Sequence, residues 1–258
     1  MLAKTMNIRR ANRGEYFLNL FNKISYHFVN QHSYANFNGF PEHEKIFYIG
    51  GILVEEDKYL YMENNNEPFP LVLVSFGTVN VGGGMSIDDF DSMIANVFSQ
   101  HTTNYKFKIK LPDNYDLPTS HNIEITHEFI EQQKILFDPN TRLFISHCGQ
   151  NSITEAIYGG VPLICIPNST DQFLNASLVE HLGIGIYVSL VWRDREHGIY
   201  RNYFEYKLSQ AVSRMLQNGN IYQQKISYLR NTILHNFYNN EVRAKDVFLQ
   251  KITSVIGD

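Results

Sequence analysis

The chain has 258 residues, of which 43% are hydrophobic and 19% charged, and its net charge is −4. This length can bury one large core or two small ones, and this composition excludes a disordered chain. A negatively charged chain without a basic stripe is not expected to bind nucleic acid.

We expect neither a secretory signal nor a membrane span in the chain as written. Residues 1–21 lack the continuous apolar stretch of a secretory signal, and no window approaches the roughly 18 apolar residues of a membrane span. Cys148 and Cys165 are too few for a disulfide framework, and neither lies at metal-ligand spacing. We therefore expect the chain, as written, to be soluble.

The first elements in chain order are a helix, a loop and a short strand. Apolar residues recur at helical spacing over residues 14–30, which predicts a helix. Residues 31–45 are rich in Asn, Gly and His and are typical of a loop or linker. Residues 46–52, IFYIGGI, are expected to form a short strand or extended entry to the region that follows.

Strands and helices then alternate. The continuous apolar run 71–78 predicts a strand buried on both faces, and 86–100 predicts a helix with Ser86 as its N-cap and Asp89 three residues on. Further strands are predicted over 105–111, 122–129, 142–147, 162–167 and 185–190, and further helices over 151–159, 173–183 (ending at Gly183), 201–218, 220–238 and 241–256. This alternation predicts an α/β fold with a parallel sheet, in which ligands bind beyond the carboxyl ends of the strands.

The turn 146–152 lies at one of those strand ends. The first amides of the following helix lack intrahelical partners, the helix dipole is positive there, and Gly149 allows close approach of an anion. His147, Asn151 and Ser152 add side-chain donors, as expected of a phosphate-binding turn. A purely structural alternative is that Ser152 and Glu155 form a capping box for the helix.

A second polar pair, Asp171-Gln172, opens the next strand-to-helix turn on the same edge of the predicted sheet. A carboxylate and an amide together offer the acceptors and donors that sugar hydroxyls need. The alternative here is that Asp171 serves as the N-cap of its helix.

Residues 129–172 resemble the signature of UDP-glycosyltransferases of the glucuronosyltransferase type. The family's motif has an opening aromatic, a Gln three residues later, a His-x-Gly-x-Asn-Ser turn, a Glu three residues after the Ser, a Gly-Val-Pro and a closing Asp-Gln. The matching residues here are Phe129, Gln132, His147, Gly149, Asn151, Ser152, Glu155, Gly160-Val161-Pro162 and Asp171-Gln172. The segments 46–52 and 74–78 also resemble the start of the family's C-terminal, donor-binding half.

The resemblance implies a role for each matching residue. Phe129, where the family usually has Trp, would stack on uracil, and Gln132 would contact polar groups of the nucleoside. Glu155 would accept from the ribose hydroxyls. The diphosphate would face His147, Gly149, Asn151 and Ser152, with Gly77 and Thr78 approaching it from the first loop; Asp171 and Gln172 would hold the sugar. Glu131 takes the place of the family's usual Pro.

The resemblance also implies the fold and the reaction. We expect a Rossmann-like sheet with helices on both faces, the C-terminal half of a GT-B glycosyltransferase: residues 46–258 would bind a UDP-sugar, and 1–45 would be the remnant of an N-terminal domain plus linker. The family transfers a hexosyl group, glucuronosyl or glucosyl, to a small lipophilic acceptor with inversion. No cofactor or metal is implied, and His147 would stabilise the diphosphate.

In the family the general base is a His in the N-terminal half, and His27 and His32 do not lie at its position. We therefore expect no catalytic base in this chain, which would bind the donor and be inactive alone. The resemblance also implies that full-length relatives are endoplasmic reticulum membrane proteins.

Three alternatives stay open at this point. The chain could be a non-catalytic UDP-sugar-binding partner of a full-length relative, in a homo- or hetero-oligomer. His147 and Cys148 could form a nucleophile pair, although adjacent residues of a strand point to opposite faces. Residues 79–85, VNVGGGM, could form a phosphate-binding loop, although the Gly-Lys-Ser/Thr ending is missing.

Overall fold

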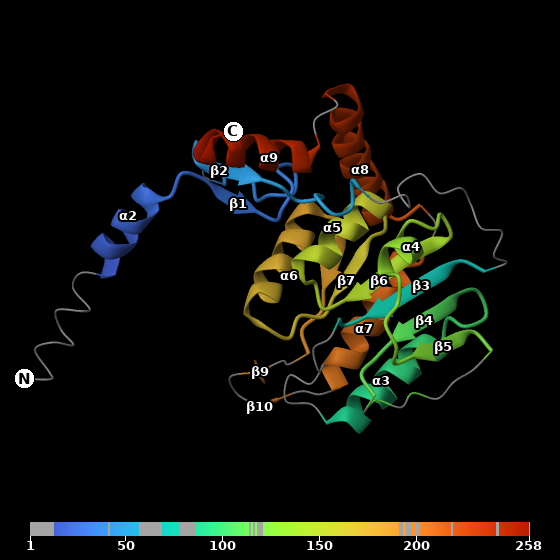
Figure 1. Cartoon of the computed structure of the whole chain (residues 1–258). Helices are drawn as coiled ribbons and strands as arrows, with labels where there is room; N and C mark the ends of the chain where they lie inside the picture. Colours follow the sequence, from blue (N-terminus) through green and yellow to red (C-terminus); the bar gives the residue numbers. More distant parts are fainter. Residues whose placement is uncertain are drawn as a thin grey trace, which may run out of the picture.

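The computed structural model describes residues 13–40, 42–56, 69–77, 86–113, 115, 117, 121–190, 193–194, 198–199, 202–217, 219–240 and 243–257. In this part of the chain the main body is a six-stranded parallel sheet with helices on both faces (Figure 1). Its strands are β3 (Leu71–Ser75), β4 (Lys106–Lys110), β5 (Ile123–Thr126), β6 (Thr141–Ser146), β7 (Leu163–Cys165) and β8 (Gly185–Tyr187).

The strand order is β5-β4-β3-β6-β7-β8. This is the doubly wound arrangement, in which the chain runs outward from β3 in one direction and then from β6 in the other. The order reverses between β3 and β6, and the crevice outside their carboxyl ends is where such sheets bind ligands. The predicted α/β parallel fold is thus confirmed.

Two hydrophobic cores flank the sheet. Val72 and Val74 pack toward the first helical layer, while Leu73 between them packs toward the second. Because successive residues of a strand point to opposite faces, a strand covered on both sides is apolar at every position. The first layer consists of α3 (Ile87–Ser99) and α7 (Asn202–Met215); the second consists of α4 (Gln132–Leu136), α5 (Gln150–Gly159), α6 (Thr170–Leu182) and α8 (Ile221–Asn240).

Local end signals explain where several helices begin and end. Ser86 Oγ accepts a hydrogen bond from the Asp89 amide at 3.2 Å, so Ser86 is the N-cap of α3 as predicted. Gly183, with φ of 68°, ends α6, also as predicted. Gly160, with φ of 71°, ends α5 in the same left-handed conformation. α4 and the two short strands β9 (Arg193–Asp194) and β10 (Gly198–Ile199) were not predicted from the sequence.

The predicted helix over 14–30 is wrong in its second half. The helix α2 (Arg13–Lys23) ends early, and β1 (His27–Val29) pairs in parallel with β2 (Ile46–Tyr48). The ring of Phe28 packs at 4.8 Å against Phe248 of the C-terminal helix α9 (Ala244–Ile256), so tertiary packing overrides the helical spacing. The strand predicted over 122–129 likewise ends at Thr126.

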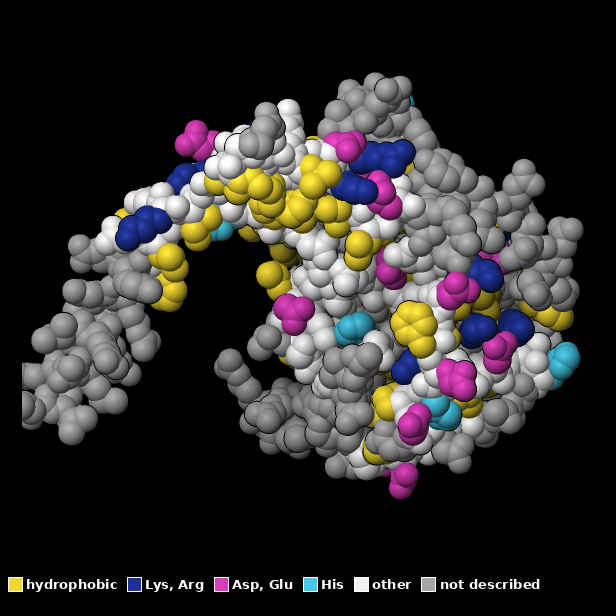
Figure 2. Space-filling model, viewed as in Figure 1, with side chains coloured by type: hydrophobic (Ala, Val, Ile, Leu, Met, Phe, Trp, Pro, Cys, Tyr) yellow, Lys and Arg dark blue, Asp and Glu magenta, His cyan; other side chains and the backbone are white. Residues whose placement is uncertain are grey.

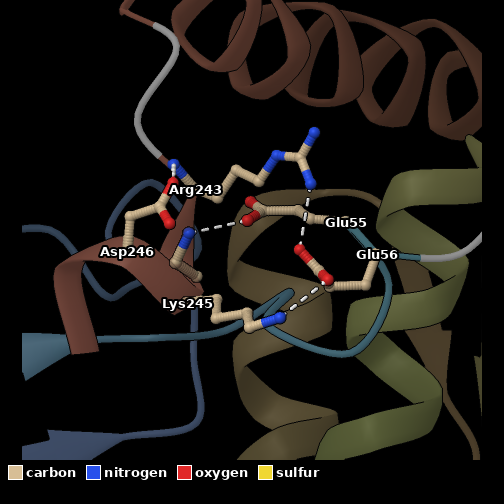
Figure 3. A network of polar contacts seen from close by, with 6 residues as sticks. Glu55, Glu56, Arg243, Lys245 and Asp246 are labelled. Atoms are coloured by element: carbon tan, nitrogen blue, oxygen red, sulfur yellow. Dashed lines mark hydrogen bonds and ion pairs between the residues drawn. The ribbon is translucent and has the colours of Figure 1, made fainter. Parts of the chain in front are cut away.

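A buried carboxylate ties α9 to the body of the fold (Figure 3). Glu55, only 7% exposed, accepts from the backbone amide of Ala244 at 2.7 Å and from the Tyr158 hydroxyl at 2.7 Å. Ala244 is the first residue of α9, so Glu55 places a negative charge at a helix N-terminus, which is favourable. Burial and the neighbouring Glu55 raise the pKa of Tyr158, which therefore stays a donor.

The adjacent carboxylate, Glu56, lies 3.0 Å from each of two cations at the start of α9, those of Arg243 and Lys245. These cations lower the pKa of Glu56. Exposed pairs of this kind add little stability, so the buried Glu55 is the main tie. Across the described ranges, no helix is long and apolar enough to span a membrane.

Stability at acid pH should depend on His32. Burial lowers the pKa of His32 to about 4, and its Nδ1 accepts from the Tyr34 amide at 3.2 Å, which requires a neutral ring. Because the folded pKa lies below the unfolded value, this contribution is complete above about pH 6.5 and is lost as the pH falls. The free energy of unfolding should be about 2 kcal/mol lower at about pH 5 than at neutral pH.

The measurement is the free energy of unfolding in urea across this pH range. His32→Asn keeps an acceptor for the Tyr34 amide but does not titrate, so its acid loss should be smaller than that of the wild type. Parallel pH curves for the two proteins would contradict the assignment.

Candidate functional site

A cavity of about 420 Å³ lies at the carboxyl ends of β3 and β4, beside the point where the strand order reverses. It is lined by Ser75, Gly77, Lys110, Phe129, Ile130, Glu131, Gln132, Gln133, Ser152 and Glu155. Five of these were predicted as site residues: Gly77, Phe129, Gln132, Ser152 and Glu155. The volume lies in the range of small-molecule sites.

The N-terminus of α5 adjoins this cavity. Its N-cap is Gly149, which has no side chain to accept from the amides of the first turn. The structural alternative, a capping box of Ser152 and Glu155, is therefore wrong: the helix begins at Gln150, so Ser152 is already its third residue. With the amides uncapped by Gly149 and the dipole positive, this helix end is suited to bind an anion.

The loop that leads into α5 is fixed from several sides. Cys148 has φ of 60°, a left-handed conformation that costs a non-glycine residue about 1 kcal/mol or more. Its amide donates to Ser146 Oγ, and its carbonyl accepts from Asn175 Nδ2, each at 3.1 Å. A disulfide joins it to Cys165, with 5.4 Å between the Cα atoms. Cys148 is thus buried and bonded, so the proposed His147–Cys148 nucleophile pair is wrong.

The imidazole of His147 packs between two glycines. A Cβ on Gly149 would lie 2.7 Å from His147 Nε2, and one on Gly77 would lie 3.0 Å from Cε1. Gly77 also has φ of 69°, which other residues rarely adopt. Glycine at both positions lets the ring lie against the loop after β3 and the loop before α5 at once. His147 therefore links the two loops that flank the switch point.

The protonation state of His147 follows from this packing. Burial lowers its pKa below the ordinary value, while the backbone of Ser75 and the charge of Asp171 act in the opposite direction. The ring is therefore neutral at pH 7 and can donate one hydrogen bond. Because it carries no positive charge, it is not repelled by the positive end of the α5 dipole.

Glu155 lines the cavity and accepts hydrogen bonds from the side-chain amides of two glutamines. Gln132 Nε2 donates to Glu155 Oε2 at 2.5 Å and also to Ser152 Oγ at 3.2 Å; Gln133 Nε2 donates to Glu155 Oε1 at 3.2 Å. The carboxylate is thus held in one orientation before any ligand arrives. A carboxylate so placed can accept from vicinal hydroxyl groups.

Phe129 stands at the rim of the cavity with 94% of its surface exposed. An aromatic ring this exposed beside a cavity offers a flat face for a planar ligand, since a base can stack on it. Glu131 lies beside it, and its carboxylate forms an ion pair with Lys134 at 3.5 Å. The negative charge at position 131 is thereby partly offset near the cavity.

Three polar lining residues were not named as site residues from the sequence: Ser75, Lys110 and Gln133. Lys110 is the last residue of β4 and brings a cation to the cavity. The signal that could have found it is its position, because β4 neighbours β3 and ends at the same edge of the sheet. Gln133 offered no such signal, since its contact with Glu155 depends on α4, which the sequence pattern did not predict.

The predicted sugar-binding pair divides into two different environments. Ser169, not Asp171, is the N-cap of α6, so the proposed capping role of Asp171 is wrong. Asp171 is exposed, and its charge reaches His147. Gln172 is only 4% exposed, and its Oε1 accepts from the amides of Asn168 at 2.8 Å and Ser169 at 3.1 Å. Gln172 therefore completes the helix cap in this structure.

The remaining predictions fall into two groups. His147 and Gly149 directly precede α5, and Asn151 lies in its first turn with Ser152 and Glu155 further along the same helix. None of the three lines the 420 Å³ cavity; Asn151 lines a smaller cavity of about 90 Å³, which shares Gln133 and Glu155 with the larger one. Thr78 and the proposed loop 79–85 lie outside the described residues. Within the described ranges, no group of three or more His, Cys, Asp or Glu side chains could hold a metal ion.

A family model described as "UDP-glucoronosyl and UDP-glucosyl transferase" matches residues 31–198, more than half of the chain. The chain belongs to this family. The resemblance seen in residues 129–172 is thereby confirmed, and with it the assignment to the UDP-dependent glycosyltransferases.

Curated relatives support the same family assignment. The chain is 34% identical over 145 residues to ugt-56 of Caenorhabditis elegans, a UDP-glucuronosyltransferase by name, covering 54% of this chain and 27% of that protein. It is 30% identical over 200 residues to ugt-46 of the same organism (74% and 35%), and 28% identical over 170 residues to mogroside IIIx synthase of Siraitia grosvenorii (61% and 35%). The matched part of the chain thus spans about a third or less of these relatives.

Solved structures show the same fold. The calicheamicin glycosyltransferase CalG4 matches with a TM-score of 0.67 at 16% identity, covering 98% of this chain and 61% of that one. The glycotransferase of kitacinnamycin matches with a TM-score of 0.61 at 19% identity, covering 80% and 50%. At these identities the likeness shows the fold alone, which is that of GT-B glycosyltransferases.

The titration of His147 tests the geometry of the site without a ligand. NMR of the ring protons should give a pKa below the ordinary value of about 6.5. Because the charge of Asp171 raises this pKa, Asp171→Asn should lower it further. Asp88→Asn, which removes an exposed carboxylate from α3 on the other face of the sheet, should leave it unchanged. A pKa at or above the ordinary value would show that the ring is not packed between the two glycines.

Proposed function

We propose that this chain binds the UDP moiety of a UDP-sugar. The single observation that carries the proposal is the placing of Phe129 and the N-terminus of α5 around one cavity. A ring for base stacking, a carboxylate for ribose and a positive helix end all adjoin this cavity, and UDP has one part to match each of them. The family supports this reading, because its members are named for their UDP-sugar donors.

Each part of the nucleotide has a matching group. Uracil stacks on Phe129, and the ribose hydroxyls donate to Glu155, which Gln132 and Gln133 orient. The diphosphate accepts from the amides that follow Gly149 and from the neutral ring of His147. Ser152 and Asn151 add side-chain donors, Gly77 approaches from the other loop, and Lys110 adds a positive charge that offsets part of the diphosphate charge.

The sugar lies beyond the diphosphate, on the side of Asp171 and Gln172. Asp171 is exposed and can accept from sugar hydroxyls. Gln172 uses its Oε1 in the helix cap, so only its NH2 group can contact the sugar. We propose a hexose, glucuronate or glucose, as the sugar.

The chemistry that this geometry serves is glycosyl transfer with inversion. The bond between sugar C1 and the β-phosphate oxygen breaks, and an oxygen of a small lipophilic acceptor forms the new bond at C1 from the opposite face. The proton of the acceptor leaves to a general base. Charge develops on the departing UDP, where the first turn of α5 is already oriented to stabilise it.

Donor binding and transfer are separable in this proposal. Residues 46–258 form the donor-binding domain, and 1–45 belong to a preceding domain and its linker. In the family the base and the acceptor pocket come from the N-terminal half. We therefore propose that this chain binds the donor and that transfer requires such a half.

Calorimetric titration with UDP, UMP and uridine tests the proposal. Affinity should fall in that order, because each step removes a phosphate from the positive end of α5. Phe129→Ala should weaken all three ligands, by about tenfold or more for lost stacking. Glu155→Ala should weaken all three as well, because it removes the ribose acceptor.

Two controls separate binding from folding. Glu44→Ala removes an exposed carboxylate from the loop 31–45 and should change neither binding nor the melting temperature. The melting temperatures of the Phe129 and Glu155 variants should stay close to that of the wild type. Folded wild-type protein that gives no heat with UDP would contradict the proposal.

A second candidate function has support from the surface. On α2, which stands away from the sheet in Figure 1, Leu18 and Leu20 are 61% and 44% exposed. Figure 2 shows hydrophobic side chains on α2 and gathered over the region where α9 lies against β1 and β2. Exposed apolar faces of this kind mark interaction surfaces. We propose that the chain serves as a UDP-sugar-binding partner of a full-length relative.

Light scattering of the chain mixed with a full-length UDP-glucuronosyltransferase tests this role. A complex should form with the wild type and be lost with Leu18→Lys combined with Leu20→Lys. A mixture that elutes as two separate species at every concentration would rule the role out.

A further inference from the structure

The side chain of Asn30 contacts the proposed pyrophosphate site from a distant part of the sequence. Asn30 Nδ2 donates to Asn151 Oδ1 at 2.7 Å, across a separation of 121 residues. Asn30 follows β1, whereas Asn151 lies in the first turn of α5. Asn30 also lies just outside residues 31–198, the range that the family model matches.

The backbone around Asn30 is fixed. The carbonyl of Val29 accepts from the Ile49 amide at 2.9 Å, and that of Gln31 accepts from the Gly50 amide at 3.0 Å. Gly51 packs against the Tyr158 hydroxyl so closely that a side chain would not fit. The segment on both sides of Asn30 is therefore held against α5, and the Asn30 amide reaches Asn151 without reordering of the backbone.

This contact determines which end of the Asn151 amide faces the ligand. A side-chain amide has a carbonyl that accepts and an NH2 group that donates. Because Asn30 donates to the carbonyl oxygen, the NH2 group of Asn151 is turned away from Asn30. A pyrophosphate only accepts hydrogen bonds, so it requires that NH2 group. The opposite orientation would place an oxygen against an anion.

We propose that Asn30 is a positioning residue that orients the Asn151 amide toward the pyrophosphate of the bound nucleotide. This inference rests on the proposed donor site. It means that the segment before β2 contributes to donor binding although it does not line the 420 Å³ cavity. The distinguishing property is that Asn30 acts on the phosphates and not on the base or ribose.

The test is the affinity for UDP compared with that for uridine in Asn30→Ala. We expect UDP to bind about threefold to tenfold more weakly, as for one lost hydrogen bond, and uridine to bind as before. Asn30→Asp keeps the shape but can only accept, so Asn151 must reverse its amide. UDP binding should then fall further than in Asn30→Ala, including at high salt, where long-range charge repulsion is screened.

Two further variants make the result specific. In an Asn151→Ala background, Asn30→Ala should have no additional effect on UDP affinity, because its target is gone. Asn36→Ala removes another short bond of the same segment, from Gln31 Nε2 at 2.7 Å, and should change neither affinity.

The outcomes are distinct. Equal weakening of UDP and uridine by Asn30→Ala, or no weakening of either, overturns the positioning role while the donor site stands. An additive effect in the Asn151→Ala background overturns it as well. Wild-type protein that binds no UDP overturns both the positioning role and the donor site.

Discussion

The rest of the site depends on one feature, the first turn of α5, whose backbone amides no side chain caps. Gly149 brings backbone amides and a positive dipole end to the edge of a cavity without a side chain in the way. Such a turn is useful only if it does not move, and the left-handed Cys148 before it is fixed by Ser146 and Asn175. The local strain in this loop is thus supported by buried contacts, as expected of a preorganised anion site.

The second requirement is the layer formed by β1, β2 and α9. These segments come from opposite ends of the chain and meet over α5 (Figure 1). Glu55 joins them by accepting from both α9 and Tyr158 of α5. This layer keeps Asn30 within reach of the helix end that we propose to face the nucleotide. A contact that looks structural, a buried carboxylate at the start of a helix, therefore also supports the geometry of the site.

Much of the fold could be predicted from the sequence, because parallel strands buried on both faces are apolar throughout, as in residues 71–74. The family motif could also be recognised from the sequence, since its residues keep fixed spacing from Phe129 to Gln172. The alternative of a capping box arises because Ser152 and Glu155 have the right spacing; it fails because the helix is capped by Gly149, three residues before Ser152. Residues 24–30 have helical spacing, but His27–Val29 pair as a strand with β2, because long-range packing overrides the local pattern. The contact between Asn30 and Asn151 leaves no local pattern at all.

A crystal structure of the chain with bound UDP tests the central claim most directly. The account predicts phosphate oxygens within hydrogen-bonding distance of the amides at the start of α5, and uracil over the ring of Phe129. UDP seated elsewhere, or a nucleotide whose phosphates point away from α5 into solvent, would contradict it.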